Sequence, residues 1–293
     1  MYDSTVKLPG GRRLGFAEYG SQTGLPVIMY HGTPGSRFHP LAALCTQNSN
    51  PHNLRVIVPE RPGCGLSDAQ PGRTVGDHVN NVQYLADFLG IERFSVIGIS
   101  GGAPYALATA AALGQRVERV AIVCGIAPLD APGMREQFGA SQRMLLSGVE
   151  EAKVEVYQMA KMVSANADAV LAHVCAGLPE EERNLIGEEM LPLYRSLLVE
   201  SYQNAEGIVD DYAVIAAPWG FGLDQIRVPV HLWHGINDKD VYIANAQYLN
   251  DQIPDSVLHT LPIGGHLTTA VICHQDVAEF VEQCFNTVQP QME

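Results

Sequence analysis

The chain has 293 residues, and its 18 Lys and Arg residues against 32 Asp and Glu residues give a formal net charge of −14. This negative charge repels phosphate backbones and anionic lipid surfaces, which argues against a nucleic-acid partner. Hydrophobic residues make up 46% of the chain and charged residues 17%, a balance that excludes a disordered protein. The length suits one large domain, or a domain that carries an insertion.

The apolar runs are too short for a membrane-spanning helix. Residues 26–30 and 120–124 are strand-length runs, whereas crossing a bilayer needs roughly 20 apolar residues. The first residues lack the basic head and apolar body of a secretion signal, so we expect a cytoplasmic protein. Six scattered cysteines without a CxxC pair predict reduced thiols rather than disulfides or a zinc site.

Short apolar runs alternate with longer amphipathic runs, which indicates the α/β class with a parallel sheet covered by helices. Residues 5–8 and 13–16 flank a Pro-Gly-Gly turn and predict a hairpin that extends one sheet edge. A helix is expected to begin at residues 74–77 and to end at Gly90, and a second to span 101–113. A last helix is expected to carry Val277, Phe280, Val281 and Cys284 on one face. The strand candidates are residues 27–30, 56–58, 94–99, 117–124, 230–233 and 256–261.

The segment 131–224 interrupts this alternation, because it has no convincing strand and reads as several helices broken at 177–179 and near Pro192. We expect it to be a helical cap inserted into a core formed by residues 1–130 and 225–293. It holds 6 basic and 15 acidic residues, a net charge of −9, so most of the acidity lies here. Such acids usually occupy solvated faces and helix N-termini, and we expect this of Glu150, Glu151, Glu180, Glu181, Glu182, Asp210 and Asp211.

The candidate nucleophile is Ser100, in the GxSxG sequence of residues 98–102. This pattern describes a sharp strand-to-helix turn with a strained central serine, and here an apolar run precedes it and an Ala-rich helix follows it. A Gly-rich turn before a helix could also hold a phosphate. The flanking elements favour the nucleophile.

A serine nucleophile requires a base, and in this type of chain order the acid and then the histidine follow the serine. His266 lies in a loop between the last strand and the last helix, where it could reach over the carboxyl edge of the sheet. His259, within a strand, and His274, within the last helix, are less well placed.

The candidate acid is Asp238, in the loop after the preceding strand. Asp240, two residues on, and Asp130 remain alternatives. The oxyanion needs two backbone N–H donors, for which we expect Gly101, after the nucleophile, and Thr33, since the following Pro34 has no N–H. His31 is expected to brace that loop.

With these residues the chain resembles the α/β-hydrolase superfamily over nearly its whole length. The resemblance is carried in order by residues 31–37 (HGTPGSR), 59–67 (PERPGCGLS), 98–102 (GISGG), 234–238 (HGIND) and 264–266 (GGH). One departure is Glu60, where relatives commonly carry Asp. The resemblance implies an eight-stranded, mostly parallel sheet with a helical cap after the sixth strand, and a Ser100, His266, Asp238 triad with Thr33 and Gly101 as oxyanion donors.

The expected function is that of a cofactor-free, metal-free serine hydrolase acting on an ester-like bond of a small molecule, of carboxylesterase or lactonase type. Ser100 argues against epoxide hydrolases and haloalkane dehalogenases, which use Asp at that position. An amidase or aminopeptidase, a carbon–carbon bond hydrolase and a receptor-like binding protein with little turnover remain open. The oligomeric state is open as well. Apolar cap residues that could line the pocket are Phe138, Met144, Met159, Met162, Tyr194 and Tyr212.

Overall fold

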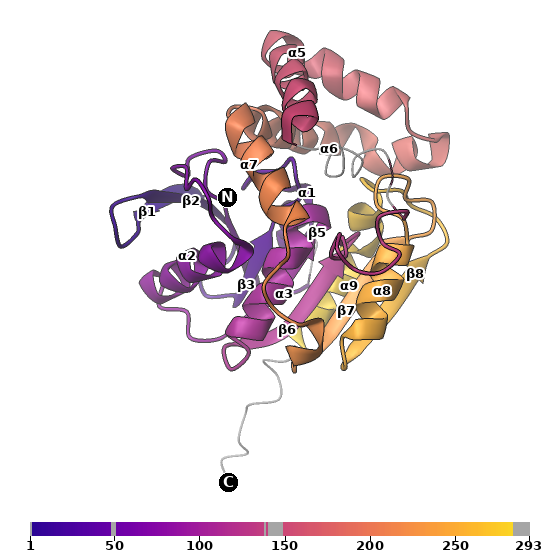
Figure 1. Ribbon diagram of the computed structural model, residues 1–293. Helices are drawn as coiled ribbons and strands as arrows, with labels where there is room; N and C mark the ends of the chain where they lie inside the picture. The colour runs from indigo at the N-terminus through magenta and orange to yellow at the C-terminus, as the bar shows by residue number, and fades with distance from the viewer. Residues whose placement is uncertain (1, 48–50, 138, 140–148, 284–293) are drawn as a thin grey trace.

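The computed structural model describes residues 2–47, 51–137, 139 and 149–283, and the structural statements below concern these residues. Eight strands form one sheet in the order β1-β2-β4-β3-β5-β6-β7-β8 (Figure 1). Strand β2 pairs antiparallel with β1 and with β4, and the remaining pairs are parallel. The predicted α/β class and the hairpin at the sheet edge are therefore confirmed. The strands are β1 (Tyr2–Lys7), β2 (Arg13–Gly20), β3 (Leu25–Tyr30), β4 (Leu54–Pro59), β5 (Phe94–Ile99), β6 (Val117–Val123), β7 (Val230–Gly235) and β8 (Ser256–Leu261).

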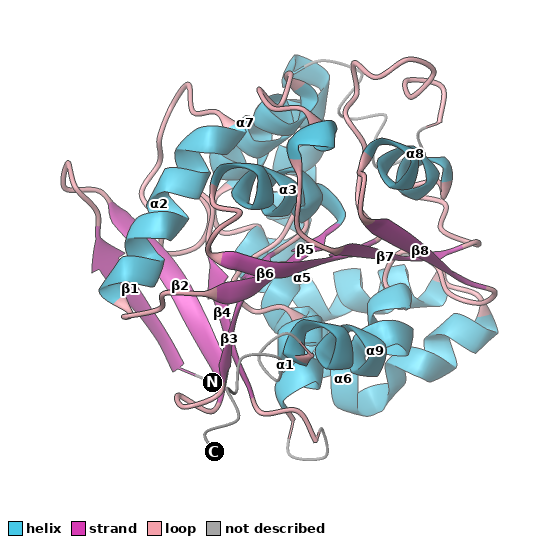
Figure 2. Cartoon of the chain, turned by 90° about the horizontal axis from the view of Figure 1, so that it is seen from below, coloured by secondary structure: helices cyan, strands magenta, loops and turns pink. Residues whose placement is uncertain are grey.

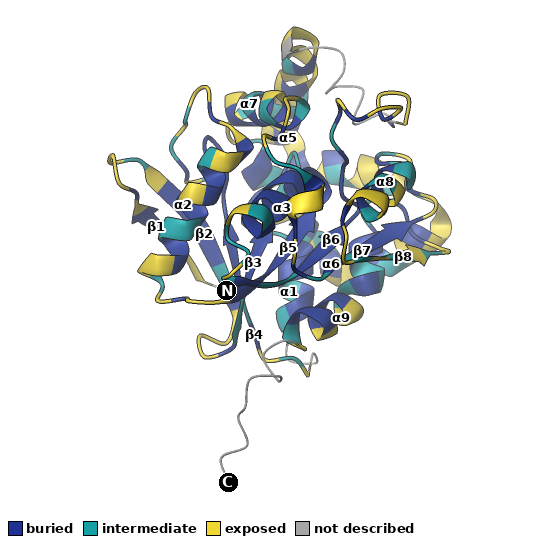
Figure 3. Cartoon of the chain, turned by 60° about the horizontal axis from the view of Figure 1, so that its bottom comes forward, coloured by how far each residue is buried: buried dark blue, intermediate teal, exposed yellow. Residues whose placement is uncertain are grey.

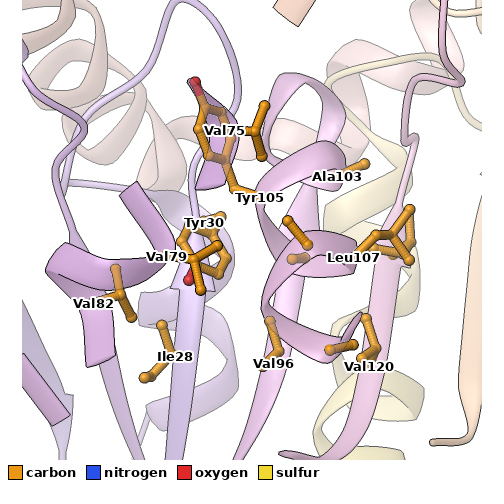
Figure 4. Close-up of a cluster of buried hydrophobic side chains, with 14 of the residues drawn as sticks. Ile28, Tyr30, Val75, Val79, Val82, Val96, Ala103, Tyr105, Leu107 and Val120 are labelled. Atoms are coloured by element: carbon orange, nitrogen blue, oxygen red, sulfur yellow. The ribbon is translucent and has the colours of Figure 1, made fainter. Parts of the chain in front are cut away.

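Helices cover both faces of the sheet (Figure 2). Helices α2 (Val75–Phe88), α3 (Ala103–Ala112) and α8 (Ala244–Gln252) lie on one face, and α1 (Pro40–Thr46) and α9 (Thr269–Glu282) lie on the other. Because successive side chains of a strand point to opposite faces, Ile28 and Tyr30 of β3 join the α2–α3 cluster (Figure 4), whereas Val27 and Met29 join the α1–α9 cluster. The central strands are thus buried on both faces, as their nearly continuous apolar sequences predict (Figure 3).

Helices α2 and α3 begin and end close to their predicted positions, whereas α1 and α8 were not predicted. Thr74 caps α2, since its hydroxyl accepts from the backbone N–H of Asp77 while the Asp77 carboxylate accepts from the backbone N–H of Thr74. The helices of the two faces are α1 (Pro40–Thr46), α2 (Val75–Phe88), α3 (Ala103–Ala112), α8 (Ala244–Gln252) and α9 (Thr269–Glu282). Short 3₁₀ turns cover Ser100–Gly102 and Leu223–Gln225.

Between β6 and β7 the described residues form three further helices, α5 (Val149–Ala176), α6 (Glu180–Ser201) and α7 (Ala205–Ala216), which we call the cap helices. They gather at one end of the molecule, at the top of Figure 1. The break expected at 177–179 separates α5 from α6. The break expected near Pro192 lies at Gly187 instead, where φ is 59°. A proline cannot pair with the carbonyl four residues before it, at Glu188, so the helix is interrupted next to that carbonyl.

None of the helices within the described ranges is long and apolar enough to cross a membrane. Among the described residues five cysteines form no disulfide, and four of them are buried; the sixth, Cys284, lies outside the described residues.

Candidate functional site

Ser100 stands at the sharp turn from β5 into α3, with a φ of 51° that non-glycine residues rarely adopt. The turn is possible because its glycines allow close approach. A Cβ on Gly98 would lie 2.6 Å from the Cβ of Ala106, and one on Gly102 would lie 2.2 Å from the carbonyl oxygen of Tyr30. The strand, the strained serine and the helix thus follow one another as the GxSxG sequence predicts.

His266 connects Ser100 with Asp238 through two hydrogen bonds. Its Nε2 lies 3.0 Å from Ser100 Oγ, and its Nδ1 lies 2.8 Å from Asp238 Oδ2. The other carboxylate oxygen of Asp238 accepts from the backbone N–H groups of Asp240 and Val241, both at 2.9 Å. These bonds hold Asp238 with one oxygen aimed at the imidazole, so that the Nδ1–H of His266 donates to Asp238 and its Nε2 faces the serine.

The electrostatics of this pair favour its charged form. Burial lowers the pKa of His266, but the carboxylate of Asp238 outweighs this effect and raises the pKa well above 6.5. Burial alone would raise the pKa of Asp238, yet the His266 charge and the hydrogen bonds to the carboxylate hold it below its ordinary value. Asp238 therefore remains ionised at neutral pH and stabilises an imidazolium.

None of the alternative histidines and acids takes part in the hydrogen bonds that join Ser100, His266 and Asp238. His259 is hydrogen-bonded to His231 at 3.0 Å, and His274 to the carbonyl of Val271 in its own helix. Asp130 is exposed, and Asp240 lines the cavity beside His266 while Asp238 holds the Nδ1 bond.

The loop after β3 faces the serine turn. A Cβ on Gly32 would lie 3.4 Å from the Cβ of Ser100, and one on Gly101 would lie 2.6 Å from Thr33 Oγ1. The two expected oxyanion donors are thus neighbours on one side of Ser100. The His31 side chain is fully buried at the base of this loop, with Nδ1 2.9 Å from the carbonyl oxygen of Gly32, as a bracing residue would be.

A cavity of about 410 Å³ opens above Ser100 and His266. Of the expected pocket residues, Met159, Tyr194 and Tyr212 line it, whereas Met162 is exposed. Phe138 and Met144 lie outside the described residues. The other apolar cap residues on its wall are Val174, Leu197, Tyr202 and Ile215.

Two groups of potential metal ligands lie within the described part of the chain: Cys124, His234 and Asp238 form one, and Asp238, Asp240 and His266 form the other. Both groups contain Asp238, whose oxygens already bind His266 and two backbone N–H groups. A metal ion at either position would compete with the Asp238–His266 hydrogen bond.

Three acids of the cap helices occupy positions that the sequence interpretation missed. Asp211, Glu182 and Glu200 are 1%, 7% and 7% exposed, and each binds a core loop. The expectation of solvated faces is therefore wrong for Asp211 and Glu182, although Glu150, Glu151, Glu180 and Glu181 are exposed. The spacing of apolar residues along α6 and α7 is the sequence feature that indicates which of these acids are buried.

The residues Ile208, Asp211, Tyr212 and Ile215 recur at intervals of three and four, so Asp211 shares the apolar face of α7 with its buried neighbours. The adjacent Asp210, which is only partly buried, does not. Glu182 is likewise four residues before the buried Ile186 on α6.

Glu60, the departure from the resemblance, is fully buried. Its carboxylate accepts from the Leu66 N–H at 2.6 Å and from Arg37 Nη1 at 2.8 Å, and Arg37 also pairs with Glu200 of α6. A Cβ on Gly65 would lie 1.9 Å from Glu60 Oε1, so the glycine leaves room for the longer acid.

Comparison with known proteins agrees with this architecture. The model of the alpha/beta hydrolase fold family matches residues 26–269. A proline iminopeptidase of Neisseria gonorrhoeae is 32% identical over 131 residues, which cover 43% of this chain and 41% of that protein. The chain thus spans about two fifths of the length of that relative.

Solved structures resemble the whole chain at low identity. A thermophilic esterase from Thermogutta terrifontis aligns with a TM-score of 0.69 and 21% identity over 99% of this chain and 100% of that one. The enol-lactonase from Burkholderia xenovorans aligns with a TM-score of 0.68 and 20% identity over 97% and 100%. The family match, the sheet order and the serine turn together show that the chain belongs to the alpha/beta hydrolase fold family.

Proposed function

We propose that the protein is a serine hydrolase that cleaves an ester-like bond of a small molecule through an acyl-enzyme intermediate. The observation that carries the proposal is the hydrogen-bonded chain Ser100–His266–Asp238 beside the cavity of about 410 Å³. A cavity of this size with mostly apolar walls suits a small acyl or alcohol group. Residues 131–224 serve as its lid and residues 1–130 and 225–293 as its catalytic core.

In the first step Ser100 Oγ attacks the substrate carbonyl carbon while its proton passes to His266 Nε2. The carbonyl oxygen becomes an oxyanion, which accepts hydrogen bonds from the backbone N–H groups of Gly101 and Thr33. Asp238 fixes the tautomer of His266 and stabilises its positive charge. When the tetrahedral intermediate collapses, the alcohol leaves with the proton from Nε2, and the acyl group stays on Ser100.

In the second step a water molecule gives a proton to His266 Nε2 and attacks the acyl carbon. The second tetrahedral intermediate expels Ser100 Oγ, which takes the proton back, and the carboxylic acid leaves. No cofactor takes part in this sequence of steps.

The direct test compares the wild-type protein with Ser100→Ala on a small p-nitrophenyl ester. We expect turnover by the wild type, none above background by the variant, and the same urea unfolding midpoint for both. Turnover retained by a folded Ser100→Ala protein would refute the proposal that Ser100 is the nucleophile.

A second candidate function is that of an aminopeptidase, because the Asp240 carboxylate lines the cavity beside His266, where it could hold a substrate ammonium group. The partial relative named proline iminopeptidase adds to this candidate. Rates on prolyl p-nitroanilide and on p-nitrophenyl acetate separate the two functions. Labelling of Ser100 by a fluorophosphonate without turnover on any panel substrate would instead favour a receptor-like binding protein.

A further inference from the structure

The loop after β3 is tied to the cap helix α7 through one buried carboxylate. Asp211 Oδ2 accepts from the Thr33 hydroxyl and from Arg61 Nε at 2.8 Å. Its Oδ1 accepts from the Tyr105 hydroxyl at 2.8 Å and from Arg73 at 3.1 Å. The two guanidinium groups outweigh the effect of burial and lower the pKa of Asp211 to about 2, so the carboxylate is charged at neutral pH.

Arg61 holds the same loop from its backbone side. Its Nη1 donates to the carbonyl oxygen of His31 at 2.5 Å, and its Nη2 to that of Gly32 at 2.7 Å. Nη2 also lies 2.7 Å from Thr33 Oγ1. The Thr33 hydroxyl therefore accepts from Arg61 and donates to Asp211, and both partners are almost fully buried, at 1% exposure.

A hydroxyl held from two sides fixes the side-chain rotamer of Thr33, and through it the orientation of the Thr33 backbone. The backbone N–H of Thr33 and that of Gly101 must converge on one oxygen atom, and an error of a few tenths of an ångström weakens such a bond. The neighbouring Tyr212 of α7 adds a long contact of 3.5 Å to the Thr33 carbonyl.

We propose that Asp211 and the hydroxyl of Thr33 are positioning residues that set the oxyanion hole, so that the hole is aligned only while α7 is seated on the core. This inference rests on the proposed serine hydrolase function. Asp211 touches no reacting atom and acts through Thr33 and Arg61. The cap thereby contributes to the chemical step in addition to enclosing the substrate.

The test uses Thr33→Val, which removes the hydroxyl while it keeps the backbone N–H and nearly the same volume, and Thr33→Ser, which restores the hydroxyl. Loss of a whole oxyanion donor costs about 10² to 10³ in kcat, so misalignment by Thr33→Val should cost about 10-fold to 100-fold, with KM within about twofold. Thr33→Ser should stay within about threefold of the wild type. Thr46→Val, which removes a partly buried hydroxyl at the end of α1 that does not line the cavity, is the control for hydroxyl loss and should leave kcat unchanged.

The second readout is inhibition by phenylboronic acid, whose boron accepts Ser100 Oγ and places an oxygen in the oxyanion hole. The inhibition constant should rise in Thr33→Val by about the factor by which kcat falls, because both depend on the same alignment. A role in stability alone would change the urea midpoint and leave kcat of the folded protein intact.

The inference is overturned if Thr33→Val keeps kcat within about twofold of the wild type, if it changes KM instead of kcat, or if Thr33→Ser is as impaired as Thr33→Val. Failure of the proposed function is seen separately, as turnover by Ser100→Ala or as no turnover by the wild type.

Discussion

The carboxylate of Glu182, on a cap helix, accepts a hydrogen bond of 3.0 Å from the backbone N–H of Gly265, the residue that precedes His266. The same oxygen accepts from the Thr268 hydroxyl at 2.7 Å. Glycine at position 265 allows this close approach, because a Cβ there would lie 2.5 Å from Glu182 Oε2. Glu182 of α6 therefore holds the loop of His266 through two residues, Gly265 and Thr268, that flank the histidine.

Replacement of Glu182 by Ala should loosen this loop. It removes the carboxylate that accepts from both the Gly265 N–H and the Thr268 hydroxyl and leaves the Gly265 N–H only its 2.9 Å bond to Thr268 Oγ1. This loss costs about 1 to 3 kcal/mol of unfolding free energy, and we expect kcat to fall about tenfold because His266 is held less well. Glu182→Gln keeps an acceptor oxygen and should retain most of both quantities. Urea unfolding and p-nitrophenyl acetate kinetics measure them, and the exposed neighbour Glu181→Ala serves as the control. Equal kinetics for Glu182→Ala and Glu181→Ala would refute the role.

Asn substitutions distinguish the two acids near His266. Asp238→Asn should lower kcat by about 10⁴, because the amide no longer holds the required tautomer. Asp240→Asn should stay within about tenfold of the wild type on a neutral ester. Measuring kcat of both variants on p-nitrophenyl acetate shows which aspartate orients His266. If only Asp240→Asn loses activity, Asp240 is the acid.

The pH profile of kcat/KM should reflect the raised pKa of His266. The base accepts a proton only when neutral, and a pKa above 6.5 means that the neutral form appears at higher pH. Activity should therefore rise with pH through a midpoint above 6.5. Initial rates at low substrate concentration from about pH 5 to about pH 9 test this. A midpoint at or below 6.5 would contradict the electrostatic effect of Asp238.

A second pH effect concerns stability and comes from His78. Its ring is fully buried between Tyr30 and Tyr105, its nitrogens have no hydrogen-bond partner among the described residues, and burial together with Arg61 and Arg73 holds its pKa well below 6.5. The other charged groups facing it are Asp211, which opposes this shift, and Arg12, which adds to it.

Below pH 6.5 the unfolded chain binds a proton that the folded His78 excludes, so stability is present above this pH and is lost as pH falls. His78→Phe keeps the ring contacts and removes the titrating group. The unfolding free energy of the variant should depend less steeply on pH between about 6.5 and about 5 than that of the wild type. Identical slopes in urea titrations would assign the acid sensitivity to other groups.

The acids near the substrate cavity should also influence which substrates are hydrolysed. Glu181, Glu182 and Asp240 line a cavity of about 430 Å³ that shares His266 with the substrate cavity. If their field reaches the entrance, an anionic ester should be hydrolysed more slowly than its neutral analogue, and added salt should raise its kcat/KM by screening. Salt-independent hydrolysis of the anionic ester would mean that the acids act elsewhere.

The sequence predicted the strands that precede Ser100, Asp238 and His266. Strands β5 and β7 are buried apolar runs, β8 is a short and partly exposed run, and each candidate lies in the loop at the carboxyl end of its strand. Asp211 was expected on a solvated face, although its helical spacing from Ile208 and Ile215 places it on the buried face of α7. Its partners Arg61 and Arg73 could not be predicted, since they are 150 and 138 residues away and only the tertiary fold brings them to the carboxylate. The break at Gly187 in place of Pro192 likewise follows from how the helix accommodates the proline, which composition does not encode.

The buried ion pairs between core and cap restrict how this protein can diverge. Arg61 and Arg73 belong to the core, but the carboxylate that neutralises them belongs to α7. Arg37 depends in part on Glu200 of α6. A chain that lost or exchanged its cap would leave buried guanidinium groups without their counter-charge, at a cost of several kcal/mol. The cap helices and these arginines therefore depend on each other, and a chimera built from two relatives should fold only if acids and arginines come from the same parent.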